Sequence, residues 1–429
     1  MSSLSDDYTS SEFSSESQPP SNASEASQAG SGPPIRFAQA ILKPRKALPF
    51  FARHPWVFDS AIDRWVGNPA DGDVVDLLSD KGKFIARGIV NSRSRLRVRL
   101  YTWSASETLE RDFFQQRLSA AIGLRRDLGL FAAGRACRVV FSEADGLSGL
   151  IVDAYDGYLV VQFHARAIAQ RAQLIYDLLI QLLKPKGILL RMEKGISHEE
   201  GLDPQQGPVW GQVPDGPVLV EEHGLRFGVD LLVGQKTGFY LDQSENRLAA
   251  ARYFAHRRVL DLFCYSGGFS LVAARHGQAR EVLGIDTSDK AILLARANAE
   301  LNRVTGVSFQ QKDCFEALDE LSAAGARFGA VILDPPKFTR SRQSIDEALR
   351  AYFRINRVAV DLLEPGGILV TCSCSGSVTR EDFRAMLAGV AQKSGRDLQI
   401  LEQRGASPDH PISATCPETE YLKCLICRV

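Results

Sequence analysis

The sequence has no excess charge of either sign, because 51 Lys and Arg residues balance 51 Asp and Glu residues. This balance gives no global sign of a polyanionic partner, although a local basic face remains compatible with it. No apolar run approaches the roughly 20 residues that span a bilayer. The first residues also lack the basic-then-apolar order of a secretory signal. We therefore expect a cytoplasmic protein without membrane association, whose eight cysteines are reduced thiols rather than a disulfide framework.

Composition divides the chain into a tail and a globular remainder. The first 36 residues are rich in serine and have almost no apolar content, so they cannot bury enough surface to fold. The remainder of the 429 residues is long enough for two or three domains. The patterns predict a disordered tail over residues 1–36, a β-rich domain over 37–106, a central α/β domain over 107–217 and a C-terminal α/β domain over 218–429.

The β-rich domain contains a row of like charges. Four arginines alternate there with Ser or apolar residues: Arg93, Arg95, Arg97 and Arg99. Side chains alternate across a strand, so the four would share one face. No acidic residue interrupts the row, and a phosphate backbone would relieve the repulsion and release counter-ions. The alternative is a solvated sheet face with counter-ions supplied from elsewhere.

The central domain shows a mixture of helical and strand patterns. The expected helices are about 107–128 and Ala167–Leu183, and the expected strands are Cys137–Phe141, Leu159–Phe163 and Gly187–Arg191. The segment from Gly201 to Pro217 is rich in Pro and Gly, and predicts a boundary loop.

From residue 218 a hairpin leads into alternating strands and helices. The expected strands are Arg258–Phe263, Glu281–Asp286, Val307–Gln311, Ala330–Leu333 and Ile368–Cys372. Repeated strand–helix units predict a doubly wound parallel sheet. The last two runs, Leu398–Glu402 and Tyr421–Val429, have no helix between them and predict an antiparallel hairpin. In such sheets, ligands bind beyond the carboxyl ends of the strands.

A glycine turn follows the first of these strands at Gly267 and Gly268. Glycine lets the backbone approach a ligand closely, and a helix N-terminus favours negative groups. Asp286 ends the next strand, where a carboxylate can accept hydrogen bonds from ribose hydroxyls. The Gly-x-Gly-x-x-Gly spacing of dinucleotide-binding proteins is absent. The turn and Asp286 therefore indicate only a nucleoside-containing cofactor, and a plain turn with a capping acid is the alternative.

The segment Ile332–Lys337 (Ile-Leu-Asp-Pro-Pro-Lys) ends the fourth strand. Its prolines fix the backbone and leave carbonyl groups free, and Asp334 can hydrogen-bond a base or a cofactor group. In combination with several other residues, this segment resembles the class I S-adenosylmethionine-dependent methyltransferases. The other residues are Asp261, Gly267, Gly268, Asp286 and Asp313.

Cys372 ends the fifth predicted strand, and Cys374 follows it. Carbon 5 of a pyrimidine is a poor nucleophile, and a thiolate that adds to carbon 6 makes it reactive. A cysteine just past this strand, facing the Asp-Pro-Pro turn, fits that need. The alternatives are core packing of both thiols, or a chelating pair. Cys424 and Cys427 are an odd number of residues apart, so they should point to opposite faces of a strand rather than form a metal knuckle.

Ordered motifs from about Leu42 to Val429 are similar to the bacterial 23S ribosomal RNA cytosine-5 methyltransferases that carry an N-terminal PUA domain. The motifs are Arg53–Phe58, Glu221–Gly224, Lys236–Gln243, Asp334–Phe338, Ser373–Gly376, Asp409–Pro411, Pro417–Glu418 and Tyr421–Lys423. The resemblance implies a Rossmann-like C-terminal domain that uses S-adenosylmethionine. It also implies that residues 37–106 form an RNA-binding PUA module, and that the substrate is one cytosine of large-subunit ribosomal RNA.

The resemblance also assigns roles to residues. Cys374 would be the nucleophile, with Asp334 and the Pro335 carbonyl positioning the cytosine and Lys337 beside them. Asp286 would hold the cofactor ribose, and Asp313 the adenine. The complete expected cofactor set is Asp261, Phe263, Tyr265, Gly267, Gly268, Asp286, Ser288, Asp313, Gln243 and Pro335. No metal is expected, and the turn has no second cysteine, which leaves the proton-abstracting base unassigned.

Two rival functions stay open at this point. The first is methylation of a guanine exocyclic amine, although Lys337 stands where such enzymes usually have an aromatic residue that stacks on the base. The second is a non-catalytic RNA-binding factor in ribosome assembly. The sequence does not decide the oligomeric state, and a homodimer is one of the states it allows.

Overall fold

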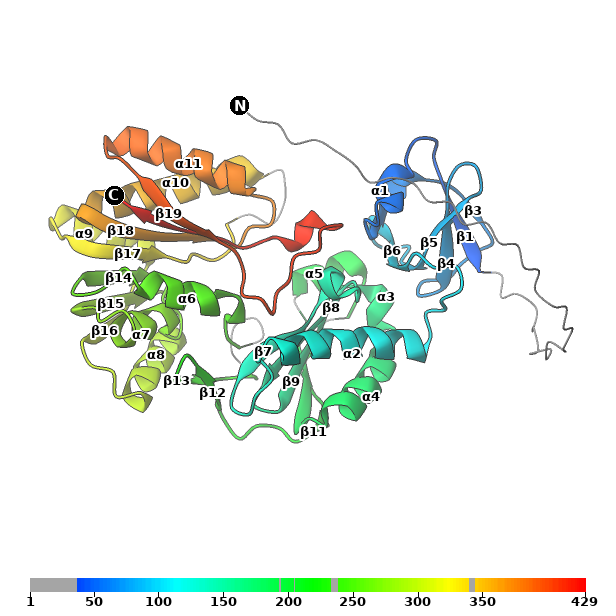
Figure 1. Ribbon diagram of the computed structural model, residues 1–429, viewed down its shortest axis with the longest axis horizontal. Helices are drawn as coiled ribbons and strands as arrows, with labels where there is room; N and C mark the ends of the chain where they lie inside the picture. Colours follow the sequence, from blue (N-terminus) through cyan, green and yellow to red (C-terminus); the bar gives the residue numbers. More distant parts are fainter. Residues whose placement is uncertain (1–36, 193, 204, 233–237, 339–343) are drawn as a thin grey trace, which may run out of the picture. The chain divides into compact units, whose positions relative to one another are not determined.

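The computed structural model describes residues 37–192, 194–203, 205–232, 238–338 and 344–429 (Figure 1). The predicted tail over residues 1–36 and part of the Lys236–Gln243 motif lie outside the described residues. Residues 37–429 form one compact unit, so the domain limits at residues 106 and 217 stay predictions.

The N-terminal part folds into a mixed sheet with the strand order β2-β6-β5-β4-β1-β3. Its elements are β1 (Ala38–Leu42), α1 (Leu48–Phe51), β2 (Trp56–Phe58), η1 (Asp59–Ala61), β3 (Ile62–Val66), β4 (Val74–Leu78), β5 (Phe84–Val90) and β6 (Leu96–Thr102). The strand expected from Arg93 begins only at Leu96. Ser94 explains the difference, because its hydroxyl accepts from the Leu96 amide at 3.2 Å and holds a turn in place of the ladder.

The central part contains a sheet with the order β11-β10-β9-β8-β7. Its elements are α2 (Arg111–Asp127), β7 (Ala136–Phe141), η2 (Ser142–Asp145), β8 (Leu150–Tyr155), β9 (Tyr158–Phe163), α3 (Arg166–Ala169), α4 (Ala172–Leu183), β10 (Gly187–Leu190), α5 (Lys194–Glu200) and β11 (Gly207–Gly211). Two strands were not expected: β8, and β11 within the predicted boundary loop.

The helix expected over Ala167–Leu183 is two helices, α3 and α4. Two side chains at the break donate hydrogen bonds to carbonyls of the N-terminal sheet's turn. Gln170 Nε2 reaches the Asp71 carbonyl at 3.1 Å, and an Arg171 guanidinium nitrogen reaches the Gly72 carbonyl at 3.0 Å. The break therefore brings the two parts of the chain into contact.

The C-terminal part contains a hairpin and a sheet with the order β16-β15-β14-β17-β18-β20-β19. The strands are β12 (Val218–Glu222), β13 (Leu225–Val229), β14 (Arg258–Leu262), β15 (Glu281–Asp286), β16 (Val307–Gln311), β17 (Phe328–Leu333), β18 (Leu363–Ser373), β19 (Gln399–Arg404) and β20 (Lys423–Arg428). The helices are η3 (Leu241–Gln243), α6 (Ser244–Ala251), α7 (Gly268–Arg275), α8 (Asp289–Leu301), α9 (Cys314–Ala323), α10 (Ile345–Leu362), α11 (Arg380–Ser394) and η5 (Pro417–Thr419).

This sheet confirms the predicted doubly wound fold. Strands β14 to β18 pair in parallel, and the predicted C-terminal hairpin is antiparallel, with β20 between β18 and β19. Helices α6, α7 and α8 cover one face, and α9, α10 and α11 cover the other (Figure 1). Cys424 packs in the first of these cores and Cys427 in the second, as their odd separation predicts.

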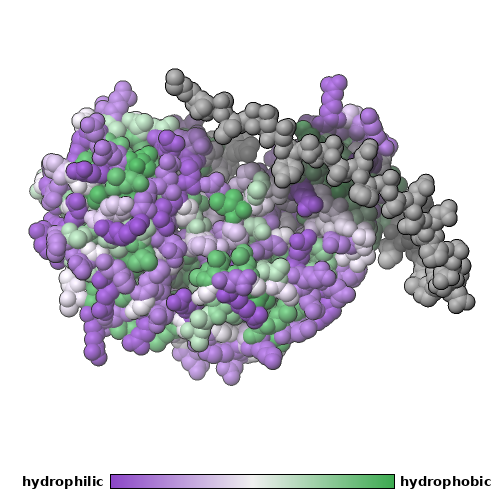
Figure 2. All heavy atoms as spheres, in the orientation of Figure 1, coloured by the Kyte–Doolittle hydropathy of each residue, from purple (hydrophilic) through white to green (hydrophobic). Residues whose placement is uncertain are grey.

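No described helix is long and apolar enough to cross a membrane. On the face shown in Figure 2, hydrophilic residues predominate and hydrophobic residues are interspersed among them.

Candidate active site

The strand order reverses between β14 and β17, which pair in parallel with Leu262 opposite Leu333. From β14 the chain runs outward through β15 and β16, and then returns to β17 on the other side. Ligands of open α/β sheets bind at such a switch point, beyond the carboxyl ends of the strands. The residues that follow β14 and β17 are Phe263 and Asp334, so the glycine turn and the Asp-Pro-Pro turn lie at this point.

The glycine turn has an unusual backbone. Gly267 has φ of +82°, and a Cβ there would lie 3.1 Å from Phe309 Cζ. Phe263 and Tyr265 also have positive φ, at 64° and 48°. Each such non-glycine residue costs on the order of 1–3 kcal/mol, and these conformations cluster at functional sites. The turn therefore holds a strained backbone ahead of the N-terminus of α7.

Two aspartates of the expected cofactor set accept hydrogen bonds from the backbone. Asp286, at the end of β15, accepts from the Tyr265 amide at 3.0 Å and from the Ser288 amide at 2.9 Å. Asp313 caps α9, where its Oδ1 accepts from the Phe315 amide at 2.9 Å. Asp286 is the last residue of β15, and Asp313 follows the neighbouring strand β16; their roles toward the cofactor stay predictions.

Asp261 near the end of β14 is fully buried. Its Oδ2 accepts from Ser270 Oγ at 2.6 Å, whereas its Oδ1 is buried without a hydrogen-bond partner among the described residues. Burial raises the pKa of Asp261 to about 7. The hydrogen bond from Ser270 lowers this pKa, whereas the negative charges of Asp334 and Asp286 raise it further. A buried carboxylate oxygen without a donor fits a cofactor that brings a cationic amino group.

The predicted nucleophile faces the Asp-Pro-Pro turn. Cys374 follows β18, and its thiol donates to the Pro335 carbonyl with Sγ and O 3.9 Å apart. Asp334 Oδ1 accepts from Gln243 Nε2 at 2.9 Å, and the Gln243 Oε1 accepts from Asn246 at 2.7 Å. Cys372 is fully buried in the core, opposite Cys424 on β20. The two neighbouring thiols thus have different surroundings, and only Cys374 is partly exposed.

The site contains two residues, Lys423 and Tyr421, that the predicted set did not include. Lys423 on β20 is buried, and its Nζ donates to the Ser375 carbonyl at 2.7 Å. The Tyr421 hydroxyl donates to the carboxylate of Asp242. Lys337 is exposed at the end of the Asp-Pro-Pro turn. The only sequence sign of Lys423 and Tyr421 was their place in the Tyr421–Lys423 motif.

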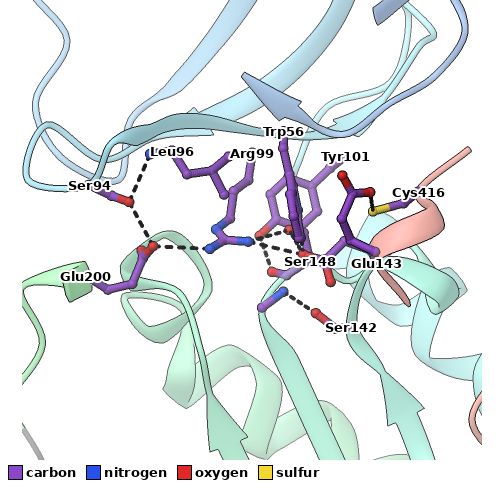
Figure 3. Close-up of polar contacts among 12 residues, drawn as sticks. Trp56, Ser94, Leu96, Arg99, Tyr101, Ser142, Glu143, Ser148, Glu200 and Cys416 are labelled. Atoms are coloured by element: carbon purple, nitrogen blue, oxygen red, sulfur yellow. Dashed lines mark hydrogen bonds and ion pairs between the residues drawn. The ribbon is translucent and has the colours of Figure 1, made fainter. Parts of the chain in front are cut away.

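The arginine row divides into two kinds of environment. Arg97 pairs with Asp59 at 3.0 Å. The Arg99 side chain is 11% exposed and lies between Glu143 and Glu200 of the central part, each 3.1 Å away (Figure 3). The row has no acidic residue along the strand itself, but carboxylates from elsewhere in the chain reach these two arginines. Arg93 and Arg95 are exposed.

Two other motifs bond distant parts of the chain to each other. The Asp409 carboxylate accepts from the Arg138 amide at 2.8 Å, and its carbonyl accepts from Arg125 at 2.6 Å. Glu222 forms a bidentate pair with Arg247 at 2.7 and 2.8 Å. These motifs position the segments that surround the site.

Comparison with known proteins identifies the family of this chain. Residues 203–427 match the family described as S-adenosylmethionine-dependent methyltransferase, and residues 40–103 match a PUA-like domain. The chain is 41% identical over 379 residues to the ribosomal RNA large subunit methyltransferase I of Aeromonas hydrophila, covering 88% of this chain and 95% of the relative. It is 40% identical over 381 residues to the protein of the same name in Escherichia coli K12, covering 88% and 96%.

A solved structure from Streptococcus mutans, described as a candidate SAM-dependent methyltransferase, has the same fold. Its TM-score is 0.79 at 18% sequence identity, over 91% of this chain and 100% of that chain. The comparisons confirm the predicted fold class, the PUA-like domain and S-adenosylmethionine as the cofactor. The chain belongs to the S-adenosylmethionine-dependent methyltransferase family and carries an N-terminal PUA-like domain.

Proposed function

We propose that this protein methylates carbon 5 of a cytosine in large-subunit ribosomal RNA through a covalent adduct with Cys374. The observation that carries the proposal is the position of the Cys374 thiol, 3.9 Å from the Pro335 carbonyl at the carboxyl ends of two adjacent strands. The relatives named for large-subunit ribosomal RNA, about 40% identical over most of the chain, support the choice of substrate. Ribosomal RNA as substrate is consistent with a cytoplasmic location.

The chemistry follows from the residues that face the crevice. The Cys374 thiolate adds to carbon 6 of the cytosine, which turns carbon 5 into an enamine-like nucleophile. S-adenosylmethionine supplies the electrophilic methyl group. A base then removes the carbon-5 proton, and the Cys374 sulfur leaves with its electron pair. Asp334, whose Oδ1 accepts from Gln243 Nε2 at 2.9 Å, and the Pro335 carbonyl would accept hydrogen bonds from the cytosine.

The cofactor would lie against the glycine turn. Asp286 would hold the ribose hydroxyls, and Asp313 the adenine amine. The unpartnered Oδ1 of Asp261 would accept from the cationic amino acid portion. The N-terminus of α7, which follows Gly267, would offer backbone N–H groups to the carboxylate of the cofactor.

The PUA-like domain would position the RNA. Of the four arginines, Arg93 and Arg95 are exposed, and we propose that these two contact phosphates. Arg97 and Arg99 already pair with carboxylates of the chain, so they would support that surface from behind.

The test uses Cys374→Ala and Cys374→Ser with ribosomal RNA from cells that lack this protein. Both variants should bind S-adenosylmethionine as the wild type does and transfer no methyl group. Digestion of RNA methylated by the wild type should yield 5-methylcytidine. Methyl transfer by Cys374→Ala would exclude the covalent route, and a methylated guanosine in the digest would instead support action on an exocyclic amine.

A further inference from the structure

A buried lysine lies next to the proposed nucleophile. Lys423 pairs in register with Ser373, at the point where β20 runs beside the end of β18. Only about 2% of Lys423 is exposed. A charged lysine is almost never fully buried unless it is paired, so its place in a fully formed sheet requires a reason.

The hydrogen bonds of Lys423 leave one donor unused. Its Nζ donates to the Ser375 carbonyl at 2.7 Å and to the Tyr421 carbonyl at 2.8 Å. An ammonium group has three donors, and no acceptor for the third is found among the described residues. The Ser375 carbonyl belongs to the residue after Cys374, so the ammonium group bonds the backbone one residue from the proposed nucleophile.

Charge and burial around Lys423 act in opposite directions. Burial lowers the pKa of Lys423 to about 8, a negative charge on Cys374 raises it, and three further groups act on it at longer range. Those three are Arg380 and Lys337, which lower it, and Glu420, which raises it. The pKa of Lys423 is therefore closer to the ordinary range of a cysteine thiol, about 8.5, than the pKa of an exposed lysine is.

We propose that Lys423 is the proton acceptor and cationic partner of Cys374. The S–H bond of Cys374 breaks, its proton forms a new N–H bond on the neutral Lys423 amine, and the electron pair stays on sulfur. The resulting ammonium directs two N–H groups at the backbone carbonyls and the third at the thiolate. Lys423 is thus a positioning residue that acts through Cys374. The inference rests on the covalent function proposed above.

This arrangement also separates the two cysteines chemically. Cys372 lies two residues earlier, is fully buried, and contacts Cys424 rather than a cation. The hydrogen bond with Cys424 and, after it, burial raise the pKa of Cys372 well above its ordinary value. A thiol held in its neutral form is a poor nucleophile, so the lysine selects Cys374.

The experiment follows alkylation of Cys374 by iodoacetamide from pH 6 to 10, measured by mass spectrometry of its peptide in the full-length protein. Lys423→Gln keeps N–H donors for the carbonyls but has no charge, and Lys423→Met removes both. Lys423→Arg keeps the charge, and Lys393→Met removes an exposed charge on α11 as the matched control. Loss of an opposite charge from the neighbourhood of a thiol raises the pKa of that thiol by about one unit or more.

We expect the alkylation midpoint of Cys374 to move upward by about one pH unit or more in Lys423→Gln and Lys423→Met. In these two variants the alkylation of Cys374 at neutral pH should slow about tenfold. In Lys423→Arg and Lys393→Met its rate should change little. An unchanged midpoint in folded Lys423→Gln overturns the proposal. If neither neutral variant folds, the wild type decides, because a midpoint at or above about 8.5 also overturns it.

Alkylation needs neither RNA nor methyl transfer, so this result is independent of the proposed reaction. Methyl transfer that survives Cys374→Ala would refute the covalent function while the alkylation shift could still be observed. If both proposals hold, Lys423→Gln lowers kcat for methyl transfer and leaves the KM for RNA unchanged.

Discussion

Arg99→Met is expected to destabilise the protein rather than to weaken its contact with RNA. Arg99 is 11% exposed, and the side chains of Glu143 and Glu200 are each 8% exposed. Removing one member of a buried ion pair costs about 3–5 kcal/mol, because the remaining charge stays buried without its partner. Figure 3 shows that both glutamates keep other donors. Trp56 donates to Glu143 at 2.9 Å and Ser94 to Glu200 at 2.9 Å, so we expect about 3 kcal/mol, the lower end of that range.

The pH dependence of this effect has a defined sign. Burial raises the pKa of Glu143, but Arg99 and hydrogen bonds from Ser142, Ser148 and Trp56 outweigh it and lower the pKa below its ordinary value of 4.5. The resulting stabilisation is present above pH 4.5 and is lost as the pH falls below it. Arg99→Met lacks the Arg99 part of this stabilisation. The difference between variant and wild type should therefore be largest near pH 7 and shrink below pH 4.

Urea unfolding followed by tryptophan fluorescence measures the change, since Trp56 lies in this cluster. The decisive comparison is the triple variant Arg99→Met, Glu143→Gln, Glu200→Gln. Replacing all partners together is nearly neutral in other proteins, so the triple variant should recover most of the stability lost in Arg99→Met.

Arg95→Met is the matched control, because Arg95 is exposed. It should change stability by no more than about 0.5 kcal/mol and lower the salt slope of RNA binding by about 0.7–0.9. Our reasoning fails if the triple variant is no more stable than Arg99→Met, or if Arg99→Met lowers the salt slope as Arg95→Met does.

Two further predictions concern buried groups of the site. The pKa of Asp261 is about 7 when folded and about 3.9 when unfolded, so its stabilisation is present below about pH 4 and is lost as the pH rises through 7. Without cofactor, the free energy of unfolding of the wild type, measured with urea, should fall by up to roughly 4 kcal/mol relative to that of Asp261→Asn as the pH rises over this interval. If the two proteins show the same dependence of this free energy on pH, the prediction is wrong. Cys372→Ala should lower stability by about 1–2 kcal/mol through a small cavity while methyl transfer continues, whereas loss of activity without loss of cofactor binding would give Cys372 a chemical role.

The C-terminal fold was predictable because its strands are short apolar runs between turn residues. Each predicted parallel strand, from Arg258–Phe263 to Ile368–Cys372, corresponds to an observed strand with limits that differ by a few residues at most, except that β18 begins five residues earlier at Leu363. Local sequence is sufficient there, since β14, β15, β17 and β18 each carry at least three buried apolar residues between turn residues.

A buried polar residue had different consequences in two strands, since β14 was predicted in spite of Asp261 whereas β8 was not predicted. Strand β8 was missed because Asp153 interrupts its apolar run. Arg138 on the neighbouring strand β7 pairs with this carboxylate at 2.6 and 2.9 Å, which makes burial of the charge acceptable. The partner is 15 residues away in the sequence, so a local pattern gives no sign of it.

The candidate site shows the same division between local and distant information. The position of Cys374 follows from a strand end, and the position of Asp334 from the turn after the neighbouring strand. The position of Lys423 depends on β20, which inserts between β18 and β19. The Ser375 carbonyl is 48 residues away from Lys423 in the sequence. A sequence pattern can therefore predict which thiol faces the crevice, whereas the group that would ionise that thiol emerges only from the register of β20 against β18.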